Sequence, residues 1–167
     1  MSFFSEFRQR NIVSGEQGSS LVEFAVSCSL LFMMIFGIMD FSRALYADHY
    51  VSNVAREASR YAMVRGSTWN SATCTTTTTY ECSATSANVT SFVKGEIPPG
   101  FSPSAVTVTT TWPGKSPSGG SCVTTNGNNS PGCVVTVNVS YSFNFILPFL
   151  PTNALVLTST SSVAIQE

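Results

Sequence analysis

The residue whose chemistry is most conspicuous is a glutamate, Glu23, inside the apolar stretch of residues 21–39. The stretch reads LVEFAVSCSLLFMMIFGIM and contains no other charged side chain. An acid inside a bilayer is costly, so it usually has a functional partner. The alternative is that Glu23 reaches the lipid headgroups and has no partner. Its position alone does not separate the two interpretations.

The residues just before Glu23 could supply such a partner. Cleavage between Gly18 and Ser19 would leave a new amine on Ser19 and make Glu23 the fifth residue of the shortened chain. The amine and the carboxylate would then be four residues apart, which is about one turn of a helix. An ammonium on a neighbouring copy could neutralise Glu23 when helices pack side by side. This spacing favours a functional role for Glu23 over simple contact with the headgroups.

Cysteines form the second group of reactive residues. Four of the five, Cys74, Cys82, Cys122 and Cys133, lie in the sparsely charged second part of the chain. An even number there is typical of an oxidising compartment. Three pairings are possible, and we favour Cys74 with Cys82 and Cys122 with Cys133. Each bond would stabilise a polar loop by about 2–4 kcal/mol. Cys28 lies in the apolar stretch, where we expect a small membrane-facing residue.

Signatures of catalysis and of nucleic-acid binding are weak. The tripeptide GKS at residues 114–116 lacks the glycine of a phosphate-binding loop, since Thr109 occupies that position and Pro117 opposes the helix that should follow. The only histidine, His49, has no evident partners for a metal site or a general base. The net charge is -1, with no basic run. We expect no enzyme activity, cofactor, metal or nucleic-acid partner.

The apolar stretch is long enough to be a membrane anchor. It has nineteen residues and no proline, against about 20 needed for a helix to cross a bilayer. A cleaved secretory signal is the alternative, but its apolar core is shorter and a small-residue cleavage site should follow it. Arg8 and Arg10 precede the stretch and favour a cytoplasmic N-terminus. The cysteines would then lie in the periplasm of a Gram-negative cell.

The helix should continue beyond the membrane, because no proline occurs before Pro98. Small or apolar residues recur there at steps of three and four. They are Ala44, Ala47, Val51, Val54, Ala58 and Tyr61. Gly66 is a natural stop. We predict one helix over residues 20–65, with an anchoring half and a half that packs on a head.

Strict alternation over residues 135–145 predicts a half-buried strand. Residues 105–112 and 155–165 alternate less regularly but are rich in β-branched residues, so we expect three antiparallel strands packed on the helix. A short helix over residues 86–94 should point Val89, Phe92 and Val93 inward. Two polar loops, residues 71–83 and 113–132, would be connectors or partner-binding surfaces. The fold class is α+β.

Three segments of the sequence carry a family resemblance. They are GSSLVEFAV, FGIMDFSRALY and NVAREASRYAMVRG, followed by a C-terminal sheet pattern with FILPFLP. Together they resemble the TadE-like minor pseudopilins of the Tad (Flp) type IV pilus system, closely over residues 15–66 and more loosely over 134–167. The resemblance implies a pilin-like fold with a cytoplasmic leader (1–18), a long helix (19–66) and a periplasmic head (67–167).

The resemblance also implies a role. A prepilin peptidase would cut between Gly18 and Ser19, with Gly18 as the required small residue and Glu23 as the acid used in subunit recruitment. A cut after Gly15 fits less well because it would place Ser20 fifth. The chain would be a minor pseudopilin of the inner membrane that supports adhesion and biofilm formation, with a TadF role also open. Its partners would be other pilins and pseudopilins, the peptidase, the assembly platform and membrane lipid. The alternative is an uncleaved bitopic binding protein of the cell envelope.

Overall fold

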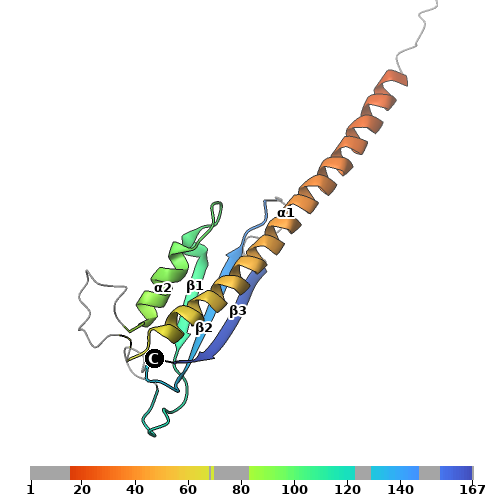
Figure 1. The fold of residues 1–167 in the computed structure, drawn as a ribbon. Coiled ribbons are helices and arrows are strands. Elements are labelled where there is room, and N and C mark those ends of the chain that lie inside the picture. Colours follow the sequence, from red (N-terminus) through yellow and green to blue (C-terminus); the bar gives the residue numbers. More distant parts are fainter. Residues whose placement is uncertain (1–15, 68, 70–82, 123–128, 147–154, 167) are drawn as a thin grey trace, which may run out of the picture. The chain divides into compact units, whose positions relative to one another are not determined.

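A computed structural model of the chain describes residues 16–67, 69, 83–122, 129–146 and 155–166. The elements are α1 (Glu16–Val64), α2 (Ser86–Gly95), a short 3-10 turn η1 (Pro103–Ala105) and the strands β1 (Val106–Thr111), β2 (Val134–Phe143) and β3 (Leu155–Ala164) (Figure 1). This confirms the predicted α+β fold. The chain divides into two compact units, Met1–Met39 and Asp40–Glu167, and each is described by itself.

The first unit contains the N-terminal part of α1. Its apolar side chains are exposed: Leu21 and Phe24, for example, each retain 70% of their accessible surface. Leucine and methionine favour the helix, and no proline interrupts it. The hydroxyl of Ser29 donates to the carbonyl oxygen of Ala25 at 2.9 Å, so this polar group is satisfied within the helix. This serine therefore needs no other part of the chain as a hydrogen-bond partner.

The second unit begins with residues 40–64 of α1, which carry the predicted apolar stripe. Ala47, Val51, Val54 and Ala58 are buried, and Tyr61 is half-buried. The helix ends at Val64, close to the predicted stop at Gly66. Chain segments distant in sequence pair with the residues that follow the helix. The amide of Ala84 donates to the carbonyl of Arg65 at 2.8 Å, for example.

The sheet is antiparallel in the order β1-β2-β3. The predicted alternation is confirmed in β2, where Val135, Val137, Val139, Tyr141 and Phe143 are all buried. Their neighbours on the strand point to the other face because the side-chain period of a strand is two. The predicted strand boundaries differ from the observed ones by at most two residues.

The helix α2 confirms the predicted short helix. Its N-terminus is capped by Thr85, whose hydroxyl accepts from the amide of Asn88 at 3.2 Å, while the Thr85 amide donates to the Asn88 side chain at 3.3 Å. Val89 and Val93 are buried. Phe92 is half-buried and stacks on Tyr61 of α1, with ring centroids 4.6 Å apart.

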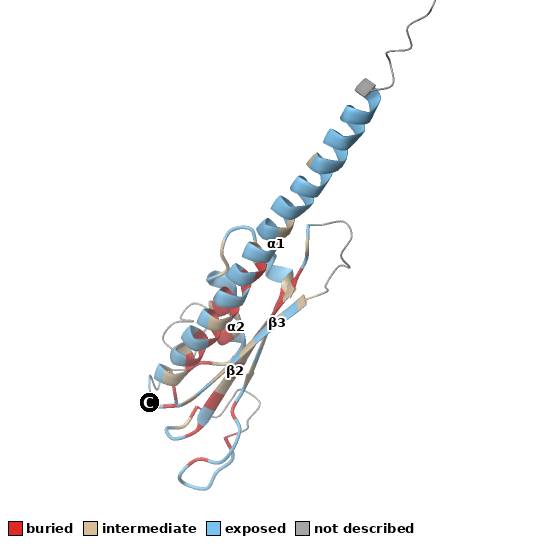
Figure 2. Cartoon of the chain, turned by 90° about the vertical axis from the view of Figure 1, so that its right-hand side faces the viewer, coloured by how far each residue is buried: buried red, intermediate tan, exposed pale blue. Residues whose placement is uncertain are grey.

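The core lies between the helices and one face of the sheet (Figure 2). Both helices contact this face: α2 packs on β1, and the Ser59 and Ser161 hydroxyls of α1 and β3 lie 2.8 Å apart. The opposite face is wetted and carries no charged residue. It consists mainly of hydroxyl and amide side chains in cross-strand rows such as Thr109, Asn138 and Thr160. Asn138 donates to Thr160 across this face at 2.7 Å.

Candidate anchoring and assembly site

The helix α1 includes the one candidate membrane span among the residues that the structure describes. An 18-residue window in it has a mean hydropathy of 2.2, and none of that window is buried within the protein. A soluble protein rarely exposes so continuous an apolar surface. Length, composition and exposure are compatible with single-pass membrane anchoring.

The structure places Gly18, Ser19 and Glu23 together in the first two turns of α1, all exposed. A Cβ added at Gly18 would meet nothing within 4 Å. Packing against the described residues therefore gives no reason for a glycine there. Among the described residues, Glu23 forms no ion pair. A partner for its carboxylate would have to come from outside this part of the chain.

The helix begins earlier than predicted. We expected it to start at residue 20, whereas α1 starts at Glu16. Glutamate and glutamine are good helix formers by intrinsic propensity, so the sequence before residue 20 does not oppose an earlier start. The bond between Gly18 and Ser19 therefore lies inside the first turn of α1. A protease that binds extended chain would have to unwind this turn, and terminal turns open at little cost.

An aspartate that the sequence reasoning overlooked lies just past the apolar stretch. Asp40 is only 3% exposed. It accepts a hydrogen bond from Arg43 Nη1 at 2.9 Å and one from the backbone amide of Ile146 at 2.9 Å. Asp40 therefore ties the chain beyond β2 to α1. The spacing of Asp40 and Arg43 was a visible signal for the ion pair, but the contact with Ile146 spans 106 residues.

One tyrosine on the inner side of α1 has an altered acidity. Tyr50 is buried, and its hydroxyl donates to the carbonyl of Val93 in α2 at 3.3 Å. Burial, and to a smaller extent the negative charge of Glu96, raise the pKa of Tyr50 from 10.0 to about 12. The neutral phenol is thus the form that holds α2 to α1.

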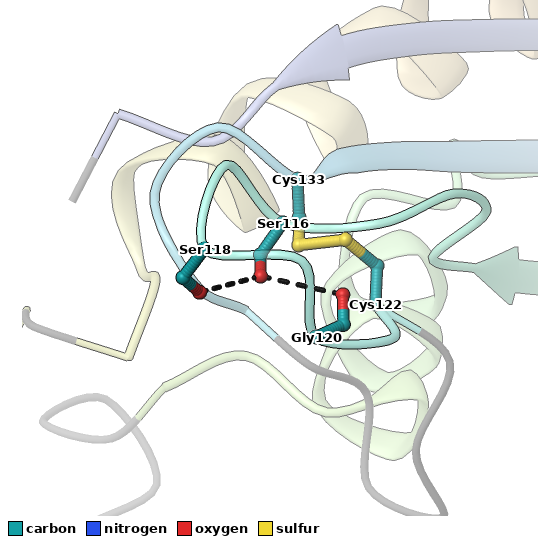
Figure 3. Close-up of a disulfide and its surroundings, with 5 residues drawn as sticks. All are labelled: Ser116, Ser118, Gly120, Cys122 and Cys133. Carbon is teal, nitrogen blue, oxygen red and sulfur yellow. Dashed lines mark hydrogen bonds between the residues drawn. A yellow bond between two sulfur atoms is a disulfide. The ribbon is translucent and has the colours of Figure 1, made fainter.

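A disulfide bond joins Cys122 to Cys133, with the Cα atoms 5.9 Å apart (Figure 3). Both cysteines are fully buried. The hydroxyl of Ser116 bonds the Ser118 hydroxyl at 2.9 Å and the Gly120 carbonyl at 3.3 Å, which closes the turn beside the bond. This pairing is the one the sequence favoured for these two residues. The other predicted pair, Cys74 and Cys82, lies outside the described residues.

The remaining candidates do not form a reactive cluster. His49 and its neighbour Asp48 are exposed on α1. Residues 114–116 lie in a turn that no helix follows, unlike a phosphate-binding loop. Within the described ranges, no group of three or more histidine, cysteine, aspartate or glutamate residues could hold a metal ion.

Fold and site together define a class: an α+β head that continues from an exposed apolar N-terminal helix compatible with membrane anchoring. Residues 18–60 match the family model described as TadE-like protein. The match confirms the predicted resemblance and covers the part of α1 that contains Gly18, Glu23 and Asp40. The TadE-like family is one of structural pilus components and is not known as a family of enzymes. No curated protein and no solved structure matches the chain.

Proposed function

We propose that this chain is a minor pseudopilin of a Tad (Flp) pilus, with a structural role in pilus assembly. The observation that carries the proposal is the exposed apolar half of α1, which contains an exposed Glu23 and lies within the TadE-like match. An apolar helix of this kind can be held in a bilayer and can later pack against other helices. A pilus-component family also implies contact with other pilus subunits.

The proposed processing is a single cut between Gly18 and Ser19 by a prepilin peptidase. Gly18 has no packing role in the structure, which is expected of a residue selected by a protease. The product begins with an amine on Ser19. In an assembling fibre this ammonium would pair with Glu23 of a neighbouring copy, because a compensated acid is far cheaper inside an apolar bundle than an isolated one.

The proposed orientation places the leader in the cytoplasm and the head in the periplasm. Arg8 and Arg10 favour retention of the leader on the inner side. The disulfide between Cys122 and Cys133 needs an oxidising compartment. The protein would be stored in the inner membrane, handled by the assembly platform and incorporated into a pilus, where it would support surface adhesion and biofilm formation.

The mass of the mature N-terminus tests this function. The full chain is isolated from cells that contain the peptidase, and we expect it to begin at Ser19. Gly18→Leu should block the cut, whereas Gly15→Leu, three residues earlier, serves as a matched control that should still be processed. An intact leader on the wild-type chain would overturn the proposal and favour the alternative, an uncleaved bitopic binding protein of the envelope.

A further inference from the structure

A small cavity opens on the head next to the first turns of α1 that follow the apolar stretch. Its volume is about 130 Å³. The cavity is lined by Arg43 and Tyr46 of α1, by Phe101 in the segment before β1, and by Tyr141 and Phe143 of β2. All of these residues belong to the second unit of the chain. The cavity thus combines one cation with several aromatic rings.

The aromatic rings form a continuous cluster. The centroid of Phe101 lies 5.6 Å from that of Tyr46 and 4.9 Å from that of Tyr141. Tyr46 is 54% exposed, so its ring remains accessible from the outside. The faces of such rings carry negative electrostatic potential and attract ammonium groups.

The cation is held in place by two contacts. The guanidinium of Arg43 lies 5.3 Å from the ring centroid of Phe143, and its Nη1 donates to Asp40. No other acceptor for Arg43 occurs among the described residues, and its side chain is 40% exposed. Planar N–H donors of this kind are suited to phosphate oxygens. The cavity therefore has rings that suit a cation and a guanidinium that suits an anion. Because the pair of Arg43 and Asp40 has no net charge, the cavity has no strong field of one sign.

The position of the cavity along the chain points to its occupant. Arg43 follows Met39, the last residue of the apolar stretch, by four residues. Along a helix this is about 6 Å. The headgroup layer on each side of a bilayer core is roughly 5–8 Å thick. If residues 21–39 cross the membrane, Arg43 and Tyr46 follow the span closely enough in sequence for their side chains to meet the headgroups, where tyrosine and arginine are commonly found.

We propose that this cavity binds the headgroup of a zwitterionic phospholipid. The phosphate would accept hydrogen bonds from Arg43, and the ammonium would lie against the rings of Tyr46 and Phe101. The proposal rests on membrane anchoring alone and is independent of cleavage at Gly18 and of pilus assembly.

The test uses the full-length chain in detergent micelles and counts bound lipid by native mass spectrometry. The probes are short-chain phosphatidylethanolamine, phosphatidylglycerol, which lacks the ammonium, diacylglycerol, which lacks the headgroup, and free phosphoethanolamine. We expect saturable one-to-one binding of phosphatidylethanolamine. The affinity for each of the other three probes should be lower by at least about fivefold. Equal binding of phosphatidylethanolamine and diacylglycerol would overturn the proposal, and so would tighter binding of the free headgroup.

Two variants separate the contributions of the cation and the rings. Arg43→Gln should weaken phosphatidylethanolamine binding about tenfold. Tyr46→Leu leaves the ion pair intact and should remove most of the preference over phosphatidylglycerol. Arg56→Gln, an exposed position on the same helix outside the cavity, should bind like the wild type. Near-ultraviolet circular dichroism checks the folding of each variant. If Arg43→Gln does not fold, binding by Tyr46→Leu alone decides the test. Unchanged binding in a folded variant at either cavity position would refute the site.

Discussion

Glu23 places a carboxylate on the exposed surface of an apolar helix. Nothing in the described part of the head compensates it. If Glu23 lies in a bilayer, its charge would have to be compensated from outside the described part of the chain, and the proposed partner is the ammonium on a neighbouring Ser19. On this interpretation, the pairing depends on the charge of the Glu23 side chain more than on its size.

Glu23→Gln keeps the shape of the side chain and removes its charge. We expect normal membrane insertion but a fall to about a tenth or less in the amount of protein found in sheared pili, since about 1.4 kcal/mol of lost pairing is a tenfold change. The measurement is an immunoblot of sheared and cell-bound fractions. Glu57→Gln is the control, because Glu57 is an exposed acid elsewhere on α1. Wild-type incorporation of the Glu23→Gln protein would contradict the pairing role.

Tyr50 gives the head a dependence on alkaline pH. Below pH 10 the phenol is neutral in both the folded and the unfolded chain, so its contribution is constant. Between 10 and about 12 the unfolded chain loses this proton while the folded chain keeps it, so the free energy of unfolding falls as the pH rises. The fall levels off above the folded pKa.

Tyr50→Phe should remove this part of the pH dependence. We expect it to cost about 0.5–1.5 kcal/mol at neutral pH, because the hydrogen bond to Val93 is lost. Thermal unfolding at about pH 9 and about pH 11 measures both effects. The wild type should lose more stability than the variant between the two pH values. An equal loss in both proteins would show that Tyr50 does not retain its proton in the folded state.

At the scale of elements, the helices and strands could be predicted because their signals are local. The period of two in β2 and the three- and four-residue steps on α1 each report one face of one element. The start of α1 and the role of Asp40 could not be predicted in this way. The first is a helix end, where local signals are weak. The second depends on Ile146, which no local pattern connects to Asp40.

The strand β2 carries much of the core, and substitutions on the two faces of the sheet should differ accordingly. Val137 is fully buried, between β1 and β3. Val137→Ala should lower the free energy of unfolding by roughly 1.5–3 kcal/mol through lost burial and a residual cavity. Val156→Ala on β3 is the matched control, since Val156 is 58% exposed and the change should cost about 0.5 kcal/mol or less. Urea unfolding followed by tryptophan fluorescence gives both values, and similar losses would contradict the assigned faces.

At the scale of the whole molecule, features that depend on neighbouring residues could be predicted from the sequence, and features that depend on distant segments could not. The apolar half of α1 and the buried Cys122–Cys133 bond were both accessible to sequence reasoning, the first from composition and the second from proximity. The cavity lined by Arg43, Phe101 and Phe143 was not, since its lining comes from three segments far apart in sequence. Only the fold brings Arg43, Phe101 and Phe143 together.

The proposed topology has a direct consequence for protease sensitivity. Protease added to spheroplasts should digest the head, beyond about residue 40, and leave a membrane-protected fragment that contains the apolar stretch. The fragment is detected by mass spectrometry, and a cytoplasmic protein serves as the control for membrane integrity. Protection of the head in intact spheroplasts would contradict a periplasmic location.

The wetted face of the sheet presents hydroxyl and amide groups where most protein surfaces present ions. Dissolved salt screens charges and leaves neutral hydrogen-bonding groups almost unaffected. The hydrogen-bonding character of this face should therefore be the same at low and at high salt concentration.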